Sequence, residues 1–144
     1  MKITIYTDGG SRGNPGPAAI GAVIACQGQT IKKYGEYIGE ATNNQAEYQA
    51  VIFALQKFKA LFGKKLAKNT ETELRSDSEL LIKQLNGRYK ILDEKIQPLF
   101  LKIWNLKFDF KKIRFKLISR EKNKEADHLV NEALDGQTKS QRLI

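Results

Sequence analysis

Residues 2–8, Lys2-Ile3-Thr4-Ile5-Tyr6-Thr7-Asp8, alternate between apolar and polar side chains and are rich in β-branched types. This pattern predicts a β-strand with one buried face. The strand leads into Gly9-Gly10-Ser11-Arg12-Gly13-Asn14-Pro15-Gly16-Pro17, whose glycines and prolines predict a loop. An acidic residue, Asp8, therefore stands where the first strand is expected to end.

Two more strands are predicted directly after this loop. Residues 18–25 and 30–38 are joined by a short turn, so the first three strands are expected to form an antiparallel meander. The apolar period then changes to three and four, which predicts a helix over residues 45–62. Asn43 or Asn44 is expected to cap this helix.

The second half of the chain alternates between strands and helices. Pro98 is tolerable only in the first turn of its helix, and Asn123 is expected to cap the last one. The predicted strands are 72–77 and 113–118, and the predicted helices are 78–85, 94–106 and 124–134. The order β-β-β-α-β-α-α-β-α favours an α/β domain with a mixed sheet and helices packed on it.

Length, charge and cysteine content narrow the class of protein. A chain of 144 residues with 25 basic and 16 acidic side chains fits one domain with a net charge of +9. That charge suggests an anionic partner such as nucleic acid. No membrane-spanning run or signal sequence is evident, and the single Cys26 excludes an internal disulfide. We expect one cytoplasmic domain with a frayed polar tail over residues 136–144.

Four acidic residues, Asp8, Glu47, Asp77 and Asp127, fall where predicted strands end or helices begin. Each alone has a structural interpretation, as a turn residue, a capping-box member, a helix cap or a partner of a helix dipole. Together in one pocket they would repel one another unless cations bind. Mg²⁺ suits such oxygen ligands, and two ions about 3.5–4 Å apart can clamp the attacking and leaving oxygens of an in-line phosphoryl transfer.

Four segments that carry these acids resemble the motifs of type 1 ribonuclease H, in the same order along the chain. They are Thr7-Asp8-Gly9-Gly10-Ser11-Arg12-Gly13-Asn14-Pro15-Gly16-Pro17, Thr42-Asn43-Asn44-Gln45-Ala46-Glu47, Ser76-Asp77-Ser78, and Arg120-Glu121-Lys122-Asn123-Lys124-Glu125-Ala126-Asp127. Any one motif is only moderately specific, whereas four in order are very specific. The resemblance covers about residues 1–135.

The resemblance implies a five-stranded mixed sheet flanked by helices. It also implies metal-dependent hydrolysis of the RNA strand of RNA–DNA hybrids, leaving 5′-phosphate and 3′-hydroxyl ends. The four acids would bind two Mg²⁺ ions in the presence of substrate, with Mn²⁺ as an alternative. The positions that would contact the hybrid are Gly9, Gly10, Asn14, Thr42, Asn43, Asn44, Ser78, Glu79 and Arg120.

Those contact positions also have structural interpretations. Asparagine suits turns and helix caps, yet its amide can equally read base edges and the 2′-hydroxyl that separates RNA from DNA. Many family members carry glutamine where this chain has Glu79, and a carboxylate cannot donate a hydrogen bond. We therefore expect a weaker contact at Glu79.

Two features of many bacterial members are missing. The short segment after residue 87 has no room for a basic, tryptophan-rich protrusion, and the loop 118–123 lacks histidine. Trp104 is predicted to pack in an apolar helix, and His128 is predicted to lie at the surface or to pack. These departures resemble the archaeal-type and some bacterial members that lack the protrusion. Affinity would then depend on salt and on scattered lysines, such as Lys64, Lys65, Lys68, Lys90, Lys111 and Lys112.

Two other functions stay open from the sequence. One is a non-catalytic module that binds hybrids, although a binding module could have lost one of the four acids. The other is a related nuclease of the same fold, either the ribonuclease H portion of a retroelement polyprotein or a junction resolvase. Because residue 1 is methionine and lies just before the first strand, we expect a free-standing monomer without an obligate protein partner or membrane attachment.

Overall fold

A computed structural model describes the chain from residue 2 to residue 143, and its side chains as far as residue 137. Its strands are β1 (Lys2–Ser11), β2 (Gly16–Cys26), β3 (Gln29–Ala41), β4 (Glu71–Ser76) and β5 (Lys112–Leu117). Its helices are α1 (Asn43–Phe62), α2 (Lys64–Lys68), α3 (Glu79–Leu85), α4 (Gln97–Lys107) and α5 (Lys124–Leu143), with a 3₁₀ turn at Arg120–Asn123.

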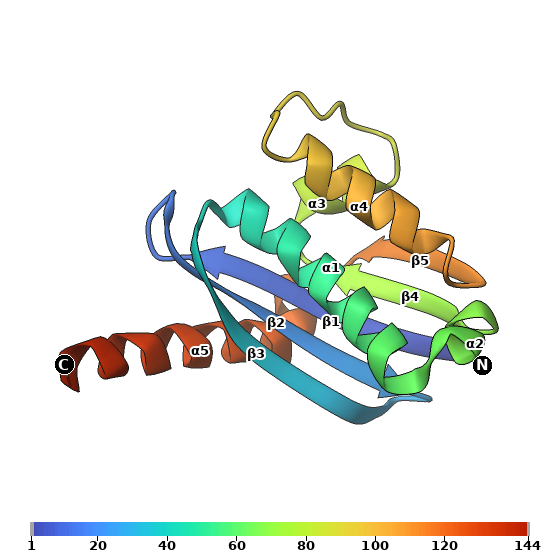
Figure 1. The fold of residues 1–144 in the computed structure, drawn as a ribbon, viewed down its shortest axis with the longest axis horizontal. Coiled ribbons are helices and arrows are strands. Elements are labelled where there is room, and N and C mark those ends of the chain that lie inside the picture. The colour runs from blue at the N-terminus through green and yellow to red at the C-terminus, as the bar shows by residue number, and fades with distance from the viewer. Residues whose placement is uncertain (1, 144) are drawn as a thin grey trace.

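The five strands form one mixed sheet in the order β3-β2-β1-β4-β5 (Figure 1). β1, β2 and β3 pair antiparallel, whereas β1–β4 and β4–β5 are parallel pairs. This arrangement confirms the predicted meander followed by strands that alternate with helices. It also places β1 at the centre, between the antiparallel and the parallel half.

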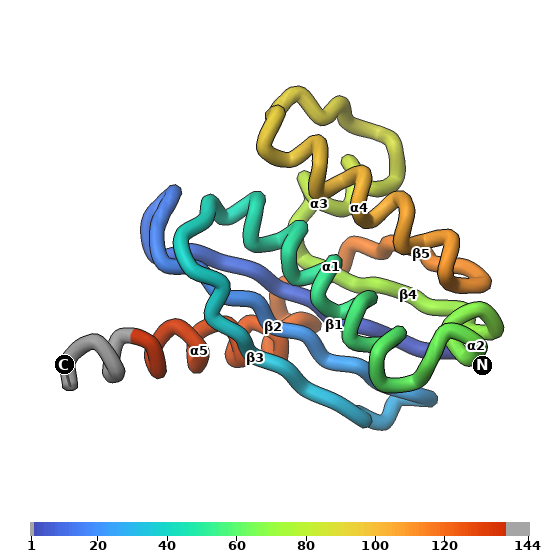
Figure 2. The backbone as a smooth tube through the Cα atoms, in the orientation of Figure 1, coloured from blue at the N-terminus to red at the C-terminus, as the bar shows by residue number. Residues whose placement is uncertain are grey.

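Helices cover the two faces of this sheet unequally. On one face, α1 packs along β1 and β2, and α4 packs against α1. On the other face, α5 packs against β1, β2 and β3, and the backbone trace shows it passing behind them (Figure 2). The half of that second face formed by β4 and β5 therefore lies beyond α5.

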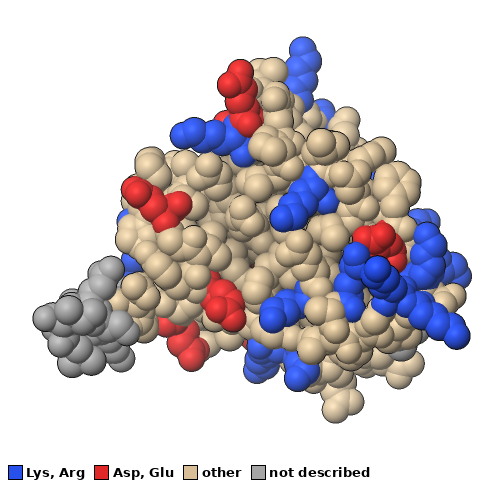
Figure 3. Space-filling view, in the orientation of Figure 1, with Lys and Arg blue, Asp and Glu red and all other residues tan. Residues whose placement is uncertain are grey.

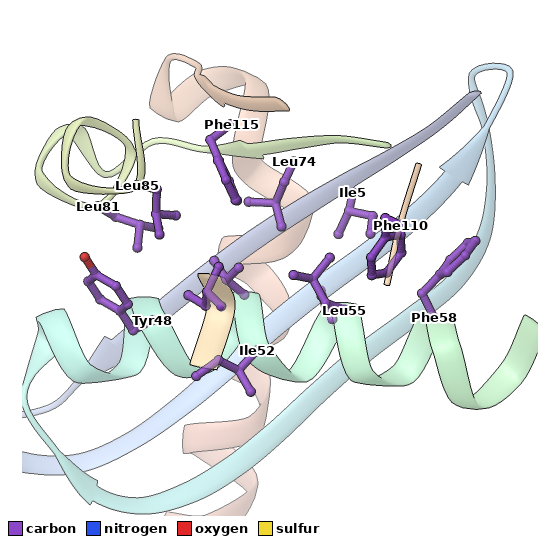
Figure 4. Close-up of a cluster of buried hydrophobic side chains, with 14 of the residues drawn as sticks. Ile5, Tyr48, Ile52, Leu55, Phe58, Leu74, Leu81, Leu85, Phe110 and Phe115 are labelled. Atoms are coloured by element: carbon purple, nitrogen blue, oxygen red, sulfur yellow. The ribbon is translucent and has the colours of Figure 1, made fainter. Parts of the chain in front are cut away.

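The main core lies between α1 and the sheet. Four apolar side chains that predicted this helix, Tyr48, Ile52, Leu55 and Phe58, are buried there (Figure 4). Burying one such side chain stabilises the fold by roughly 1.5–3 kcal/mol. The Tyr48 hydroxyl donates to Oε1 of Gln84 on α3 at 2.8 Å, which satisfies both polar groups inside the core.

The predicted cap of α1 is wrong, because Thr42 caps the helix instead of Asn43 or Asn44. The Thr42 hydroxyl accepts from the Gln45 amide at 3.1 Å, and the Thr42 amide donates to Gln45 Oε1 at 2.8 Å. This capping box starts the helix earlier than predicted. Consequently Glu47 lies in the second turn, not the first, and Asn43 is free to contact the glycine-rich loop.

Two helices also differ from the sequence predictions. The short helix α2 lies between α1 and β4, where no helix was predicted. Helix α5 continues through the predicted tail to Leu143. Residue 144 and the side chains beyond residue 137 lie outside the described residues, so the domain boundary at residue 135 stays a prediction.

The connection between α3 and α4 is short, as predicted, and contains no further helix among the described residues 86–96. The packing prediction for Trp104 is wrong, because its side chain is 45% exposed on α4. There it meets the Phe108 ring edge-on, and the Lys107 ammonium lies 4.4 Å from the indole centroid. Within the described part of the chain, no helix combines the length and the apolarity needed to cross a membrane.

Candidate active site

Asp8 and Asp77 lie side by side because β1 and β4 are parallel neighbours. The ladder between these strands ends at the pair Tyr6–Arg75, so each acid lies two residues beyond the same pair. β1 continues past this point through its pairing with β2, whereas β4 ends. The prediction that Asp8 ends its strand is therefore wrong, but Asp8 and Asp77 lie close together, as expected of acids that share one pocket.

Glu47 reaches the same place because β1 and α1 touch backbone to backbone. A Cβ atom on Gly9 would lie 2.3 Å from the carbonyl of Ala46 and 2.5 Å from the Glu47 nitrogen. Real Cβ atoms do not approach so closely, so only glycine permits this contact. Gly9 was expected to admit substrate; its closest packing is instead with the helix that carries Glu47.

Asp127 is positioned by a similar contact on the other face of the sheet. Gly21 pairs with Asp8 across the β1–β2 ladder. A Cβ on Gly21 would lie 2.3 Å from the carbonyl oxygen of Ala126, so α5 meets β2 directly opposite Asp8. Glycines on adjacent strands thus allow α1 to approach β1 and α5 to approach β2 beside Asp8.

Asn123 fastens the start of α5 to β1. Its buried side-chain amide donates to the Thr7 carbonyl at 2.9 Å. Its Oδ1 is buried and accepts no hydrogen bond from the described residues, so the predicted role as a helix cap is wrong. The side chain instead fixes the turn that precedes Asp127.

The geometry brings three carboxylates into one cluster. Oxygen atoms of Asp8, Glu47 and Asp77 all lie within 4.8 Å of one another. Asp127 is outside this set but lines the same cleft, and its side chain is close enough to hydrogen-bond with Asp8. The sequence predicted all four acids in one pocket, and the structure places three at its centre and one at its side.

Burial and mutual repulsion shift the pKa values of these acids upward. Burial, followed by the charges of Asp77 and Asp127, raises the pKa of Asp8 to about 7 from an ordinary 3.8. Burial and the neighbouring Asp8 and Asp77 raise the pKa of Glu47 well above its usual range. Hydrogen bonding from the Gly9 backbone offsets part of both shifts. Without a cation, the cluster therefore favours bound protons.

The cluster suits a hard divalent cation. Oε2 of Glu47 is buried and has no hydrogen-bond partner among the described residues. A buried carboxylate oxygen without a partner is costly, and a cation would satisfy it while relieving the repulsion that raises the pKa values. All the donors are carboxylate oxygens, which are preferred by Mg²⁺ and similar ions.

The glycine-rich loop is tied to the start of α1 by two asparagines. The Asn43 amide donates to Oδ1 of Asn14 at 2.9 Å, and the Ser11 amide donates to Oδ1 of Asn43 at 2.9 Å. Both side-chain oxygens are thereby used within the protein. The side-chain NH₂ groups of Asn14 and Asn43 have no partner among the described residues, so donors remain for a ligand.

Other predicted contact residues lie around the cleft in capping or exposed positions. The Ser78 hydroxyl caps α3 by accepting from the Leu81 amide at 3.2 Å. Glu79 is paired with Lys83 at 2.6 Å, which holds the pKa of its carboxyl below its usual range. Thr42 is occupied in the capping box, and Asn44 is half-buried beside it. Substrate contact at these positions stays a prediction.

The cleft is lined by predicted site residues and by others that the sequence did not indicate. The predicted residues that line it are Asp8, Gly9, Gly10, Asn43, Glu47, Asp77, Arg120 and Asp127. The additional ones are Ser11, Arg12, Val130, Asn131 and Leu134. The last three follow Asp127 at intervals of three, four and seven, so helical periodicity could have identified them. Arg12 forms an ion pair with Asp135 at 2.6 Å, which ties the loop to α5.

His128 lies at the surface, in agreement with its prediction. Its side chain is 74% exposed, and its Nε2 lies 3.1 Å from Oε2 of Glu132. It does not line the cleft that contains the preceding Asp127.

Comparisons with known proteins agree with this geometry. Residues 6–133 match the family described as reverse transcriptase-like. Ribonuclease HI of Halobacterium salinarum is 42% identical over 93% of this chain and 65% of its own length. A bifunctional protein of Mycobacterium tuberculosis is 37% identical over 97% of this chain, which spans only 37% of that protein. The chain thus covers less than two thirds of these curated relatives.

Solved RNase H1 structures resemble this chain over almost their whole length. LC11-RNase H1, isolated from compost, is 48% identical with a TM-score of 0.89, and the match covers 95% of this chain and 98% of that one. The same enzyme was also solved in complex with an RNA/DNA hybrid, with a TM-score of 0.89. RNase H1 of Halobacterium salinarum is 41% identical with a TM-score of 0.86, covering 94% of this chain and 99% of that one.

Proposed function

Because this chain belongs to the type 1 ribonuclease H family, we propose that it is a metal-dependent endonuclease that hydrolyses the RNA strand of RNA–DNA hybrids. The observation that carries the proposal is the cluster of Asp8, Glu47 and Asp77. A module that only binds hybrids has no need to bury like charges at such close range, since that arrangement destabilises the fold. The cluster therefore favours catalysis.

Asp8, Glu47 and Asp77 would hold the cation, with Asp127 completing the set at the side of the cleft. Bound divalent ions, two with substrate present, would polarise the scissile phosphate and lower the pKa of the attacking water. We assign Mg²⁺ to this role, with Mn²⁺ able to substitute, because the ligand set consists only of oxygen.

The remaining residues of the cleft would position the hybrid. Arg120 lines the cleft beside the acids and can donate to the phosphate next to the scissile bond. The side-chain amides of Asn14 and Asn43, and Asn44 beside them, are suited to the 2′-hydroxyl and the base edges of the minor groove. The Gly9 and Gly10 backbone would lie against the sugar-phosphate chain.

We assign the three outer contacts to the flanks of the hybrid. Thr42 retains a hydroxyl proton that can donate to a phosphate of the DNA strand. Ser78 can do the same from the start of α3. Glu79 contributes least, because its carboxylate accepts from Lys83 and cannot donate.

We also propose the domain bounds, the oligomeric state, the location and the products of this enzyme. We place the catalytic domain at residues 1–135 and treat 136–144 as an appended tail. We expect the enzyme to act as a monomer in the cytoplasm, on hybrids that arise during DNA replication. Cleavage should leave 5′-phosphate and 3′-hydroxyl ends.

The deciding experiment is a strand-resolved cleavage assay with the RNA or the DNA strand end-labelled. Hybrid, double-stranded RNA and double-stranded DNA are compared in Mg²⁺, in Mn²⁺ and in chelator. We expect cleavage of the RNA strand of the hybrid only in the presence of a divalent ion, with products that a ligase requiring 5′-phosphate can join.

Two variants accompany this assay. Asp77→Asn should abolish cleavage while the circular dichroism spectrum stays native. His128→Ala is the matched control, because this side chain lies next to Asp127 in sequence but outside the cleft, and it should cleave normally. Absence of cleavage by the natural chain at every metal concentration would refute the proposal, and cleavage of branched DNA alone would favour a resolvase.

A further inference from the structure

A second charged surface lies on the face of the sheet that α5 leaves open. In β1, β4 and β5, the residues on one side of each strand face the main core, and those on the other side alternate with them. The open side carries Lys2, Thr4 and Tyr6 on β1, Glu71, Glu73 and Arg75 on β4, and Lys112, Arg114 and Lys116 on β5. We call this surface the open-face groove.

Part of the open-face groove is a hollow whose lining carries excess positive charge. It has a volume of about 190 Å³, and its charged lining consists of Lys2, Glu71, Glu73, Arg75, Lys112 and Arg114. A second hollow adjoins it, shares Thr4 and Arg75 with it, and extends to Lys122.

The β5 cations form a regular row along this surface. Lys112, Arg114 and Lys116 alternate along the strand, so successive charges are about 6.6 Å apart. This interval is close to the distance between neighbouring phosphates in an extended nucleic acid strand. The strand holds the three positions in line without any need for the ligand to order a loop.

Two of these three cations have no acidic partner. Lys116 lies 3.6 Å from Glu73, which also accepts from Arg75 at 3.2 Å. Lys112 and Arg114 form no ion pair with any described residue. In addition, Nε of Arg75 is buried without a hydrogen-bond partner in the described part of the chain. Lys112 and Arg114 therefore offer unused donors and uncompensated charge at the surface.

The row leads toward the candidate active site. β5 runs parallel to β4, and the Ile118 amide beyond its end donates to the Ser76 carbonyl at 2.9 Å, next to Asp77. Two residues further along, Arg120 lines the cleft that contains the acids. A chain that follows the row from Lys112 toward Lys116 is thereby directed to the edge of that cleft.

From this arrangement we infer that the open-face groove binds an unpaired nucleic acid strand that emerges from the hybrid at the cleft, with Lys112, Arg114 and Lys116 contacting successive phosphates. The inference rests on the proposed function for the hybrid end of the path. It identifies the preferred substrate as a hybrid next to single-stranded nucleic acid, not an isolated blunt hybrid.

The test compares binding of a blunt hybrid with binding of the same hybrid extended by ten unpaired nucleotides. Fluorescence anisotropy is measured in the Asp77→Asn background, so that cleavage does not interfere. Extensions of DNA or RNA are placed at each 5′ and 3′ end, which identifies the strand and the polarity. We expect at least one extension to tighten binding about tenfold near 0.1 M salt.

The triple variant Lys112→Ala/Arg114→Ala/Lys116→Ala should remove this gain, and it should weaken binding of the blunt hybrid no more than the matched control below does. Losing three phosphate contacts to a single strand should also reduce the slope of log K against log salt by about 2. The matched control, Lys90→Ala/Lys95→Ala/Lys102→Ala, removes the same charge from exposed positions on the α3–α4 side and should retain the gain.

A separate arm measures native protein with unpaired oligonucleotides alone, so that the groove is tested even if hybrid cleavage fails. Weaker binding of these oligonucleotides by the row variant than by the control would support the groove independently of the proposed function. Equal affinity for blunt and extended hybrids in the native sequence would overturn the inference. The same loss in both triple variants would also overturn it, because total charge would then explain the binding.

Discussion

The candidate active site and the open-face groove use charge in opposite ways. At the site, like charges are crowded within 4.8 Å and largely buried, and backbone contacts at Gly9 and Gly21 fix their positions. In the groove, charges of one sign predominate but are spaced along an exposed strand and partly paired. The site therefore depends on geometry, and the groove depends on the number of charges.

This difference predicts steep effects at the site and graded effects in the groove. Removing one carboxylate from the buried cluster should prevent it from holding its divalent cations. Removing one surface cation should weaken nucleic acid binding only by a small increment. The face that carries α1 has its own basic cluster at the α2 end, with acidic side chains scattered over the surface (Figure 3).

The largest effect is expected for Asp8→Asn. Losing a central ligand should lower the cleavage rate by about 10³-fold or more, since metal stabilisation of the transition state is worth several kcal/mol. The same change should raise the free energy of unfolding at pH 8 in chelator, because it removes a buried charge that two neighbours repel. Cleavage rates and urea denaturation measure the two effects. A loss of activity of only a few fold would show that the site does not depend on each of its ligands.

The pH dependence of stability should show the repulsion directly. Asp8 ionises at an ordinary pKa of 3.8 when unfolded but near 7 when folded, so between these values the folded state binds the extra proton. The free energy of unfolding of the metal-free protein should therefore fall as pH rises from about 4 to 7. The decrease due to Asp8 is at most roughly 4 kcal/mol.

Urea denaturation from pH 4 to pH 8 in chelator tests this expectation, with Asp8→Asn measured alongside to subtract the other groups. The stability gained by the variant should grow with pH and level off above pH 7. Mg²⁺ should reduce the difference. A stability difference that shrinks as pH rises would contradict the assignment.

The backbone contacts provide the next largest effect. Gly9→Ala places a methyl group 2.3 Å from the Ala46 carbonyl, so α1 must move away from β1 and take Glu47 with it. We expect a loss of about 3 kcal/mol in stability together with weaker cleavage. Gly10→Ala is the control, because its methyl would lie 3.6 Å from Cγ1 of Val130, an ordinary contact, and its stability should change little. Equal stability losses would show that backbone contact does not position the site.

The four acids could be predicted from the sequence because they are carboxylates and because they stand near predicted strand ends and helix starts. The parallel pairing of β1 and β4 was enough to bring Asp8 and Asp77 together. The roles of Gly9 and Gly21 could not be predicted in the same way. They depend on how closely a helix approaches a strand, which no local pattern encodes.

The cap of α1 and the exposure of Trp104 show where local patterns fail. Several neighbouring residues can cap one helix, and the choice of Thr42 depends on a reciprocal bond with Gln45. Trp104 occupies an apolar helix, but only packing decides which face of that helix is covered. The open-face groove escaped the sequence for a related reason, since its cations come from three strands that only the fold places side by side.

The smallest effect concerns Glu73, the acid in the groove that pairs with its cations. Glu73 is partly exposed and accepts from Arg75 at 3.2 Å, with Lys116 at 3.6 Å, and these cations lower its pKa. Glu73→Gln should reduce the free energy of unfolding by less than about 1 kcal/mol, because solvent screens such pairs. This contribution is present above the ordinary pKa of glutamate and is lost as pH falls through the lowered one.

The same substitution should strengthen the binding of unpaired oligonucleotides about two- to threefold at low salt, since it frees two cations for phosphate. Denaturation and anisotropy on one variant thus give small changes of opposite sign, unlike the joint loss expected for Gly9→Ala. Glu36→Gln on β3 serves as the control, because it removes an equal charge outside the groove and should alter neither quantity appreciably. Weaker oligonucleotide binding by Glu73→Gln would show that the groove depends on the arrangement of its ion pairs and not on its count of positive charges.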